Sequence, residues 1–315
     1  MFPEKSHEFR LIDRFKRVAG NRSDVLLGIG DDAAVVRHLQ PSGLLAADIL
    51  LEGVHFEIPP ATPRQVGHKA MAVNLSDIAA MAGSPRFALV SVALPRSSEN
   101  EDLADNLFAG LHSTAGRYGA AIVGGDTTTW NGPLVINVSV FGDTHERGPI
   151  TRGNARPDDW IFVTGELGGS LAGSHLTFEP RVEEARALHE TVELHAMLDV
   201  SDGLVADLYH ILEESGVGAI LNADSIPLSQ AASSAEDGTS PLQHALGDGE
   251  DFELLFTVSP DDGERLLTAN LFETQLTRIG TITTEQRCIL TDSVRDSIEL
   301  PRLGWAHGFD AGVRP

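Results

Sequence analysis

The sequence predicts a two-domain α/β (α+β) fold, and three observations lead to this prediction. The chain has 315 residues with 42% hydrophobic composition, which is enough to bury two cores. Its first half alternates short apolar runs, typical of strands, with longer segments that carry helix-start signals. Residues 142–159, rich in Gly, Pro, Arg and Asp, interrupt this alternation before a new strand-like run begins. We therefore expect domains at residues 1–150 and 151–315.

Three apolar runs near the N-terminus are expected to be strands. Residues 25–27 and 33–36 stand on either side of an acidic turn, and residues 43–47 lead directly to Asp48. Such short strands would place the carboxylates that follow them in loops.

A helix is expected from Thr62 to about Met81. Thr62 is a suitable N-cap, a proline follows at the first helical position, and Gln65 completes a capping box. In such a helix Asn74 and Asp77, three residues apart, share one face.

The next elements carry similar local signals. Residues 98–101 form a second capping box, which predicts a helix that ends near Gly119. The apolar run 120–123 is predicted as a buried strand that leads into a loop with Asp126. Residues 134–141 alternate between apolar and polar side chains, as a half-buried strand does.

The second half is expected to begin with a strand at residues 160–164. The glycine-rich residues 165–170 should then open a helix, and a further helix is expected over residues 204–215. Residues 252–258 have the composition of a strand, whereas residues 229–240 are small and polar and predict a mobile loop.

The composition excludes several classes of protein. The formal charge is −23, whereas nucleic acids and anionic membrane surfaces require a basic patch, so we expect neither as a partner. Cys288 is the only cysteine, which rules out an internal disulfide, and its apolar neighbours predict a buried strand residue rather than a nucleophile. No apolar run approaches a membrane span and no secretory signal is found, so we expect a cytoplasmic protein.

Five acidic clusters, four of which contain glycine, are the main functional signal. They are Gly28-Ile-Gly-Asp-Asp32, Asn74-Leu-Ser-Asp77, Gly124-Gly-Asp-Thr127, Asp199-Val-Ser-Asp-Gly203 and Gly247-Asp-Gly-Glu-Asp251. A single Asp-Gly pair is more typical of a turn than of a ligand. Converging carboxylates, however, repel one another unless cations lie between them, and Mg²⁺ prefers oxygen ligands. The set therefore predicts several Mg²⁺ ions that neutralise a polyphosphate.

Other site motifs have little support. Residues 28–33 match the G-x-G-x-x-G/A pattern, but Asp31 and Asp32 would place negative charge beside a pyrophosphate. The chain has no Walker A motif, no H-E-x-x-H zinc motif and no G-x-S-x-G elbow. Residues 165–170 could bind phosphate through backbone N–H groups, although a plain turn explains them equally well. His55, close after Asp48, is open to either a structural or a functional interpretation.

Taken together and in this order, the motifs closely resemble the thiamine-monophosphate kinase family. Its superfamily also contains aminoimidazole ribonucleotide synthetase, selenophosphate synthetase and a hydrogenase maturation protein. The motifs that carry the resemblance are Gly28-Ile-Gly-Asp-Asp-Ala-Ala34, Asp48 with Gly53-Val-His-Phe56, Lys69-Ala-Met-Ala-Val-Asn-Leu-Ser-Asp77, Gly124-Gly-Asp-Thr127, Thr151-Arg152, Asp199-Val-Ser-Asp-Gly-Leu204 and Gly249-Glu-Asp-Phe-Glu-Leu254. They span nearly the whole chain.

The resemblance implies a two-domain PurM-like fold whose N-terminal domain dimerises through its sheet. It implies Mg²⁺-dependent transfer of the ATP γ-phosphoryl group to thiamine monophosphate in a cleft between the domains, directly and in line. The implied Mg²⁺ ligands are Asp32, Asp48, Asp77, Asp126, Asp199 and Asp202, assisted by Asp31. The implied nucleotide contacts are Gly125, Asp126, Arg152 and Ser201, and Asp126, Asp202 and Arg152 would support the transfer without a covalent intermediate. The implied substrate contacts are His55, Glu250 and Phe309, with Trp305 as a neighbour.

Three positions depart from the family pattern. Ala46-Ala47 stand where the family has Ser-Thr before Asp48, so weaker binding of one metal is expected. The family's Met-Gly-Ala-x-Pro appears as Met81-Ala-Gly-Ser-Pro85, and its Gly-Gly-Glu-Asp as Asp248-Gly-Glu-Asp251. Two alternatives stay open: another ATP-using enzyme of the superfamily, and a Mg²⁺-nucleotide binding protein without catalysis.

Overall fold

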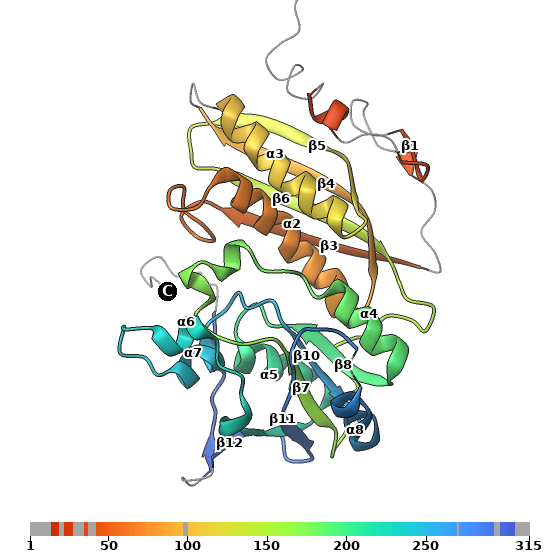
Figure 1. Cartoon of the computed structure of the whole chain (residues 1–315), viewed down its shortest axis with the longest axis vertical. Helices are drawn as coiled ribbons and strands as arrows, with labels where there is room; N and C mark the ends of the chain where they lie inside the picture. The colour runs from red at the N-terminus through yellow and green to blue at the C-terminus, as the bar shows by residue number, and fades with distance from the viewer. Residues whose placement is uncertain are drawn as a thin grey trace, which may run out of the picture. The chain divides into compact units, whose positions relative to one another are not determined.

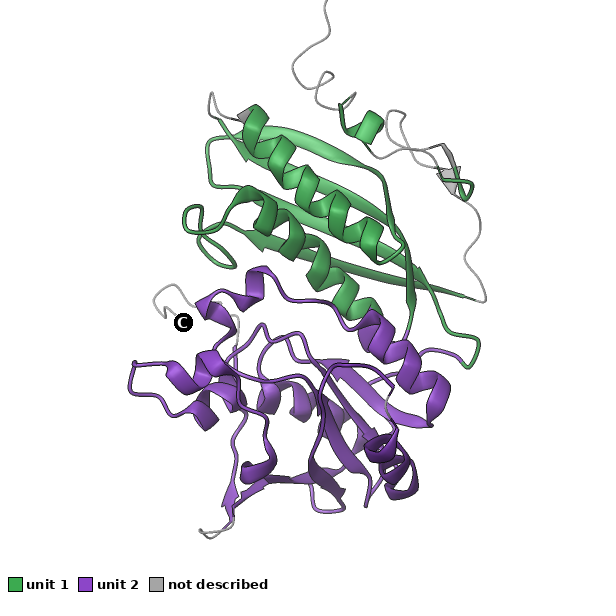
Figure 2. Ribbon diagram, viewed as in Figure 1, with its two compact units in different colours: residues 1–78, 83–147 green, residues 79–82, 148–315 purple. Residues whose placement is uncertain are grey.

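The computed structural model describes residues 14–18, 22–27, 35–36, 42–96, 100–269, 271–292 and 297–305. The chain divides into two compact units, one of Met1–Ile78 and Gly83–Arg147 and the other of Ala79–Ala82 and Gly148–Pro315 (Figure 2). Both units combine strands with helices, so the predicted two-domain α/β (α+β) class is confirmed. None of the helices in the described ranges is long and apolar enough to cross a bilayer.

The first unit is built on a four-stranded sheet in the order β3-β6-β4-β5. Its strands are β3 (Gly43–Leu51), β4 (Ser84–Pro95), β5 (Ala121–Trp130) and β6 (Val135–Asp143). Strand β6 is antiparallel to β3 and β4, whereas β4 and β5 are parallel. Helices α2 (Pro63–Ala80) and α3 (Asn100–Arg117) lie side by side along one face of the sheet (Figure 1). Apart from this sheet, β1 (Val25–Leu27) pairs antiparallel with β2 (Val35–Val36).

Two glycines let helices α2 and α3 come into backbone contact. A Cβ atom on Gly67 would lie 2.1 Å from the Leu107 carbonyl oxygen, and one on Gly110 would lie 2.1 Å from the Arg64 carbonyl oxygen. Any larger residue at either position would force the helices apart. This close crossing fixes the position of α2, which carries the predicted site residue Asp77.

The side chains of strand β3 alternate between a buried face of the sheet and an open face. Leu44 and Leu50 are buried, whereas Leu45 and Ile49 are 72% and 53% exposed. Alternate residues of a strand point to opposite faces, and the helices cover one of them. Leu45 and Ile49 therefore form an apolar strip on the face that α2 and α3 leave open.

The second unit contains a seven-stranded sheet in the order β13-β12-β9-β11-β7-β10-β8. Its strands are β7 (Trp160–Thr164), β8 (Leu194–Asp199), β9 (Gly218–Asn222), β10 (Leu254–Val258), β11 (Leu276–Thr283), β12 (Cys288–Thr291) and β13 (Ile298–Glu299). Only the β12–β9 pair among them is parallel. Its helices are α4 (Val182–Thr191), α5 (Leu204–Ser215), α6 (Gln230–Ser234), α7 (Pro241–Gly247) and α8 (Pro260–Thr268).

Helix α5 packs against this sheet and forms the main core of the second unit. Its Leu208 and Ile211 are buried in one cluster with Ile161 and Val163 of β7 and Leu198 of β8. Each such side chain contributes roughly 1.5–3 kcal/mol by leaving water. The packing holds the short loop between β8 and α5, residues 200–203, at the end of strand β8.

Most elements lie where the sequence predicts them. Thr62 and Gln65 form the predicted capping box, in which the Gln65 N–H donates to Thr62 Oγ1 at 3.3 Å and the Thr62 N–H donates to Gln65 Oε1 at 3.0 Å. Helix α5 has the predicted bounds. Cys288 is fully buried on β12, where burial raises the pKa of its thiol to about 12, so the prediction of a non-nucleophilic cysteine is supported.

Two predictions of local structure in the second unit are wrong. Residues 165–170 do not open an α-helix but lead into short 3₁₀ turns, because Gly168 and Gly169 adopt left-handed φ values of 86° and 74°. Residues 229–240 are not a single loop, since Ser229 caps α6 and Ser240 caps α7 with its side chain.

Candidate functional site

Asp48 and Asp77 form an acidic pair in the first unit. Asp48 lies within β3, not in the predicted loop, and its N–H donates to Asn74 Oδ1 of α2 at 3.1 Å. Asn74 is fully buried, and its amide donates to the Ala70 carbonyl at 3.1 Å. Asp77, almost one turn further along α2, is hydrogen-bonded to the side chain of Asp48. Asn74 and Asp77 therefore share the face of the helix that meets β3, as predicted.

This pair has the chemistry of a cation site. Burial raises the pKa of Asp48, and the hydrogen bond with Asp77 only partly opposes that shift. Two carboxylates in contact need a shared proton or a bound cation, because their negative charges otherwise repel. A donor set made of oxygen atoms suits Mg²⁺, so Asp48 and Asp77 fit the ion that the sequence predicts.

His55 follows β3 in a tight turn and is fixed by two hydrogen bonds. The Leu51 N–H donates to His55 Nδ1 at 3.0 Å, and Lys69 Nζ donates to the His55 carbonyl at 2.6 Å. Lys69 is fully buried in α2. Because Nδ1 accepts a hydrogen bond, the neutral ring carries its proton on Nε2. His55 can therefore donate from Nε2 to an anion such as a phosphate group.

Gly125 and Asp126 lie within β5 and not in a loop after a strand, as the sequence suggests. A Cβ atom on Gly125 would lie 1.7 Å from the Val90 carbonyl oxygen, so glycine is required there. Asp126 is exposed, and its Oδ1 accepts from the Thr127 N–H at 2.9 Å. Strands β5 and β3 are opposite edges of the sheet, which separates Asp126 from Asp48 by three strand spacings, roughly 14 Å. Within the sheet of one chain, the two carboxylates are not brought together.

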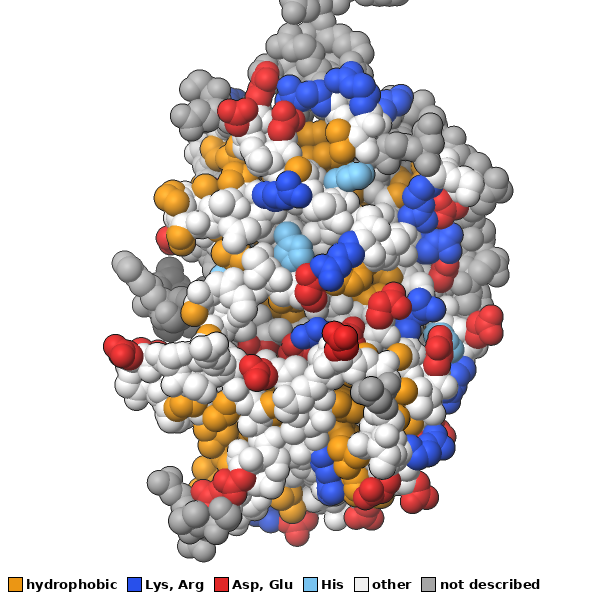
Figure 3. Space-filling model, viewed as in Figure 1, with side chains coloured by type: hydrophobic (Ala, Val, Ile, Leu, Met, Phe, Trp, Pro, Cys, Tyr) orange, Lys and Arg blue, Asp and Glu red, His pale blue; other side chains and the backbone are white. Residues whose placement is uncertain are grey.

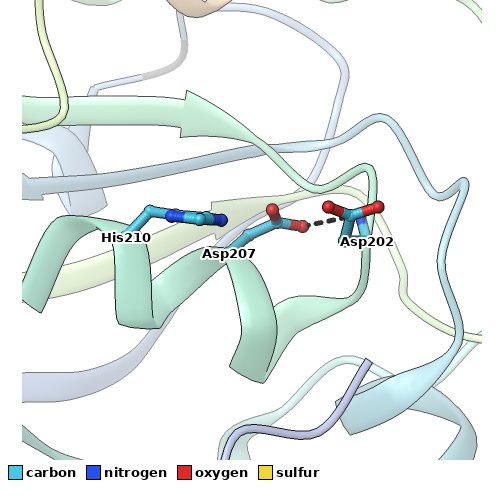
Figure 4. A group of neighbouring side chains, drawn as sticks. All are labelled: Asp202, Asp207 and His210. Carbon is cyan, nitrogen blue, oxygen red and sulfur yellow. Dashed lines mark hydrogen bonds between the residues drawn. The ribbon is translucent and has the colours of Figure 1, made fainter. Parts of the chain in front are cut away.

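A second acidic group lies where β8 leads into α5. Asp199 ends β8 and is buried, and Ser201 and Asp202 lie in the loop that follows. Asp202, Asp207 and His210 each offer a ligand atom, and these atoms lie within 4.8 Å of one another (Figure 4). Among the residues that the structure describes, this is the one group of three or more His, Cys, Asp or Glu side chains that could hold a metal ion.

Sequence reasoning missed Asp207 and His210, because a spacing of three residues in a helix is ordinary. Burial raises the pKa of Asp207 to about 7, and the nearby charges of Asp199 and Asp202 act in the same direction. Burial also lowers the pKa of His210, and the positive charge of Arg152 adds to this effect. Arg152, which is exposed, therefore lies close enough to α5 to act on this group.

Glu250 lies beside the same loop. Its N–H donates to the Ser201 carbonyl at 2.7 Å, and its carboxylate contacts His175 Nδ1 at 2.9 Å. Glu250 adopts a φ of 66°, a conformation that costs a non-glycine residue free energy and persists only where contacts hold it. The predicted residues Ser201, Asp202 and Glu250 are thus brought together in the second unit.

Asp248 stands where the resembled family has glycine, and the structure gives it a role. Its carboxylate accepts from the Gly169 N–H at 2.8 Å and contacts His244 Nδ1 at 2.8 Å. Asp251 likewise accepts from the Gly168 N–H at 2.9 Å. The aspartate at position 248 therefore helps to hold the glycine-rich loop after β7.

Three of the predicted site residues, Asp31, Asp32 and Phe309, lie outside the described residues. Trp305 is described, and its N–H donates to the Asp202 carbonyl at 2.8 Å while the residue is 39% exposed. It is therefore a neighbour of the second acidic group.

Charge on the visible surface is mixed. On the face shown in Figure 3, acidic and basic side chains are interspersed, and the described residues form no extended basic area there. With a formal charge of −23, the chain does not attract an anion through its overall field. An anionic substrate therefore depends on local donors such as Arg152 and on bound cations.

Comparison with known proteins identifies the family of this chain. The models of the AIR synthase related protein, N-terminal domain, and of its C-terminal domain match residues 30–144 and 154–293. The thiamine-monophosphate kinase of Rhodopirellula baltica is 43% identical over 268 residues, which cover 82% of this chain and 84% of that protein. The chain belongs to the thiamine-monophosphate kinase family. The resemblance seen in the motifs is thereby confirmed.

Solved structures agree with this assignment. The crystal structure of thiamine-monophosphate kinase from Stenotrophomonas maltophilia K279a is 35% identical, has a TM-score of 0.80, and covers 90% of this chain and 96% of that chain. A structure described as AaThiL complexed with AMPPCP and TMP is 28% identical, has a TM-score of 0.72, and covers 95% and 99%. A hydrogenase maturation protein in complex with ATP has a TM-score of 0.78 at 20% identity, which shows a shared fold only.

Proposed function

We propose that the chain transfers the γ-phosphoryl group of ATP to thiamine monophosphate, giving ADP and thiamine diphosphate, and that it does so in the cytoplasm. The observation that carries this proposal is the similarity, over 95% of the chain, to a family member complexed with AMPPCP, an ATP analogue, and TMP. Curated relatives at 43%, 38% and 35% identity are named for the same activity.

The reaction is a direct in-line transfer between two phosphate groups. The acceptor oxygen of a phosphate monoester is already ionised at neutral pH, so a strong general base is not required. The barrier lies in bringing two anions together in the correct orientation, which makes positioning and charge neutralisation the main tasks. Mg²⁺ bound by the acidic residues would supply positive charge against the phosphates.

In the first unit, Asp48 and Asp77 are proposed Mg²⁺ ligands, and Asp126 is proposed to hold a Mg²⁺ ion at the β5 edge beside the nucleotide-contacting Gly125. His55 donates from Nε2 to the phosphate of thiamine monophosphate. The geometry that supports these roles is the hydrogen-bonded contact of Asp48 with Asp77 and the orientation of the His55 ring by Leu51.

In the second unit, Asp199 and Asp202 are the proposed Mg²⁺ ligands. Ser201 and Arg152 are proposed to contact the nucleotide, and Arg152 adds a permanent positive charge near the transferred group. Glu250 is proposed to attract the cationic thiamine moiety. The proposed roles of Asp32 as a Mg²⁺ ligand and of Phe309 as an aromatic contact for thiamine stay predictions.

We further propose that the chain works as a homodimer that pairs through the open face of the four-stranded sheet. The apolar strip of Leu45 and Ile49 is exposed in the single chain. Moreover, Asp48 and Asp126 of one chain lie roughly 14 Å apart, whereas two aspartates on one Mg²⁺ ion are at most about 11 Å apart at their Cα atoms. A second copy could supply the missing ligand. Light scattering that finds only monomers would count against this arrangement.

Another activity of the superfamily that relies on a reactive thiol is not favoured, because the only cysteine of the chain, Cys288, is fully buried.

The decisive assay measures ADP formation from ATP and Mg²⁺ with and without thiamine monophosphate, and follows thiamine diphosphate by chromatography. We expect ADP to form only when thiamine monophosphate is present, and to stop with EDTA. ADP formation that does not depend on thiamine monophosphate would indicate another substrate, and nucleotide binding without turnover would indicate a non-catalytic protein.

A further inference from the structure

The N-terminus of helix α5 is occupied by a side chain of its own helix. The backbone N–H groups of Ser201, Asp202 and Gly203 all donate to Asp207 Oδ2, at 2.9, 2.9 and 3.1 Å. The Asp207 N–H in turn donates to the Gly203 carbonyl at 3.0 Å. Asp207 is only 3% exposed, so these bonds are sheltered from water. One carboxylate oxygen therefore satisfies three successive N–H groups in front of the helix.

The carbonyl groups of the same loop are also used within the second unit. The Ser201 carbonyl accepts from the Glu250 N–H at 2.7 Å, and the Asp202 carbonyl accepts from the Trp305 N–H at 2.8 Å. The backbone N–H and carbonyl groups of residues 201–203 thus all form hydrogen bonds within the protein. The backbone N–H groups of this loop are therefore taken, and we expect a ligand to meet the side chains of Ser201 and Asp202.

Two glycines show how closely the loop is enclosed. A Cβ atom on Gly249 would lie 2.6 Å from the Ser201 carbonyl oxygen, and one on Gly304 would lie 2.4 Å from the Asp202 carbonyl oxygen. The backbone at Gly249 and at Gly304 therefore packs against the carbonyl groups of the loop, while Asp207 accepts hydrogen bonds from its N–H groups. These contacts hold the backbone of the loop from both sides.

This arrangement reverses the usual chemistry of a helix N-terminus. Free N–H groups at the start of a helix bind phosphate directly, aided by the helix dipole. Here the carboxyl group of Asp207 already takes that place, and Asp202 adds a negative charge. A bare phosphate is repelled from this end of α5, whereas a phosphate that carries a divalent cation can be held through Asp202.

We propose that Asp207 is a positioning residue for nucleotide binding, which fixes Ser201 and Asp202 and makes the binding of the nucleotide depend on Mg²⁺. This inference rests on the proposed function, because it assumes that Ser201 and Asp202 meet a Mg²⁺-nucleotide. In this role Asp207 acts through Oδ2, which accepts the three backbone hydrogen bonds and so holds the loop.

The test compares ADP binding with Mg²⁺ and with EDTA by calorimetry, in the wild type and in Asp207→Asn. The substitution keeps the size of the side chain but removes the titrating carboxyl group and weakens the bonds to the three N–H groups. We expect the Kd for ADP with Mg²⁺ to rise about tenfold and the Kd with EDTA to stay equal or fall, so that the Mg²⁺ dependence shrinks. The KM for thiamine monophosphate should change little.

Ser259→Ala is the matched control. Ser259 caps α8 in the same unit by accepting from the Asp262 N–H at 3.2 Å, and it has no part in the proposed site. Its loss lowers stability as the loss of a cap does, but should leave the Mg²⁺ dependence of ADP binding unchanged.

Three results would overturn the proposal. One is an unchanged ratio of the two ADP affinities in folded Asp207→Asn. Another is an equal rise of the KM values for ATP and for thiamine monophosphate in Asp207→Asn, together with a lower melting temperature. A purely structural role of Asp207 predicts that result. The third is a loss of turnover with unchanged ADP affinity, which would place Asp207 in the reaction itself.

If Asp207→Asn does not fold, Asp207→Glu takes its place. Asp207→Glu keeps the carboxyl group but displaces it by one methylene group. We expect the Mg²⁺ dependence of ADP binding to shrink in this variant too, but by less than in Asp207→Asn. An unchanged Mg²⁺ dependence would overturn the proposal. Binding is measured without turnover, so the two proposals can fail separately. A wild type that binds ADP with Mg²⁺ but makes no thiamine diphosphate would refute the proposed function alone.

Discussion

Asp251→Asn tests how the glycine-rich loop after β7 is held. Asp251 is 8% exposed, accepts from the Gly168 N–H at 3.0 and 2.9 Å, and is hydrogen-bonded to the Ser170 hydroxyl. Burial raises the pKa of Asp251 to about 7, the charges of Glu253 and Asp248 add to the rise, and the two donors oppose it. The asparagine keeps the shape of the side chain and removes the titration.

The expected magnitude follows from the pKa of Asp251. It is about 7 in the folded protein against an ordinary value of 3.8. Between these values the folded state keeps a proton that the unfolded chain has released, so the free energy of unfolding falls as pH rises. In this range each pH unit lowers the free energy of unfolding by about 1.4 kcal/mol per group. Asp251 alone should therefore lower the free energy of unfolding by roughly 2–3 kcal/mol between about pH 5 and about pH 7.

Urea unfolding followed by circular dichroism at several pH values measures this effect. As pH rises, the free energy of unfolding should fall more steeply for the wild type than for Asp251→Asn. Other titrating groups that act independently contribute equally to both proteins, so the difference between the two slopes reports Asp251 alone. At neutral pH the variant should be at least as stable as the wild type. A variant that loses more than about 2 kcal/mol at neutral pH, with the slope unchanged, would refute the reasoning, because the carboxylate would then be ionised and stabilised by its donors.

Three further predictions concern the proposed site and the first unit. Asp126→Asn and Asp202→Asn should each lower turnover by several orders of magnitude without changing the circular dichroism spectrum, because each weakens a Mg²⁺ position; near-normal ADP formation in both at saturating Mg²⁺ would contradict the site. His55→Ala should raise the KM for thiamine monophosphate with little effect on kcat, and an unchanged KM would remove the proposed contact. Gly110→Ala should lower the free energy of unfolding in urea by about 1–3 kcal/mol or more, since the new methyl group would lie 2.1 Å from the Arg64 carbonyl oxygen; a wild-type midpoint would show that the helices separate freely.

Elements with local signals were predictable from the sequence. Thr62 and Gln65 stand three residues apart, so their capping box depends on near neighbours alone and marks the start of α2. The glycine-rich loop differs, because Gly168 and Gly169 are held by carboxylates 83 and 79 residues further along the chain. A helix-start signal at this loop cannot reveal such partners.

The same distinction applies to the site. Asp48, Asp77 and Asp202 could be proposed as site residues from the sequence, because acidic motifs in that order are typical of one family. Asp207 and His210 could not, because their spacing in α5 is that of any helical pair. Asp207 meets the loop that carries Asp202 through hydrogen bonds between residues four to six apart, which the helical spacing alone does not reveal.

The sequence by itself determined which ligand chemistry this chain offers: oxygen donors in a fixed order, no reactive cysteine, and the family to which such motifs belong. Tertiary structure alone decided which of these donors lie close together. It joins Asp48 of β3 to Asp77 of α2, and it places Asp126 on the opposite edge of the sheet from Asp48. The physical reason is that strand order and helix packing arise from contacts between residues far apart in the chain, whereas the motifs record only neighbours.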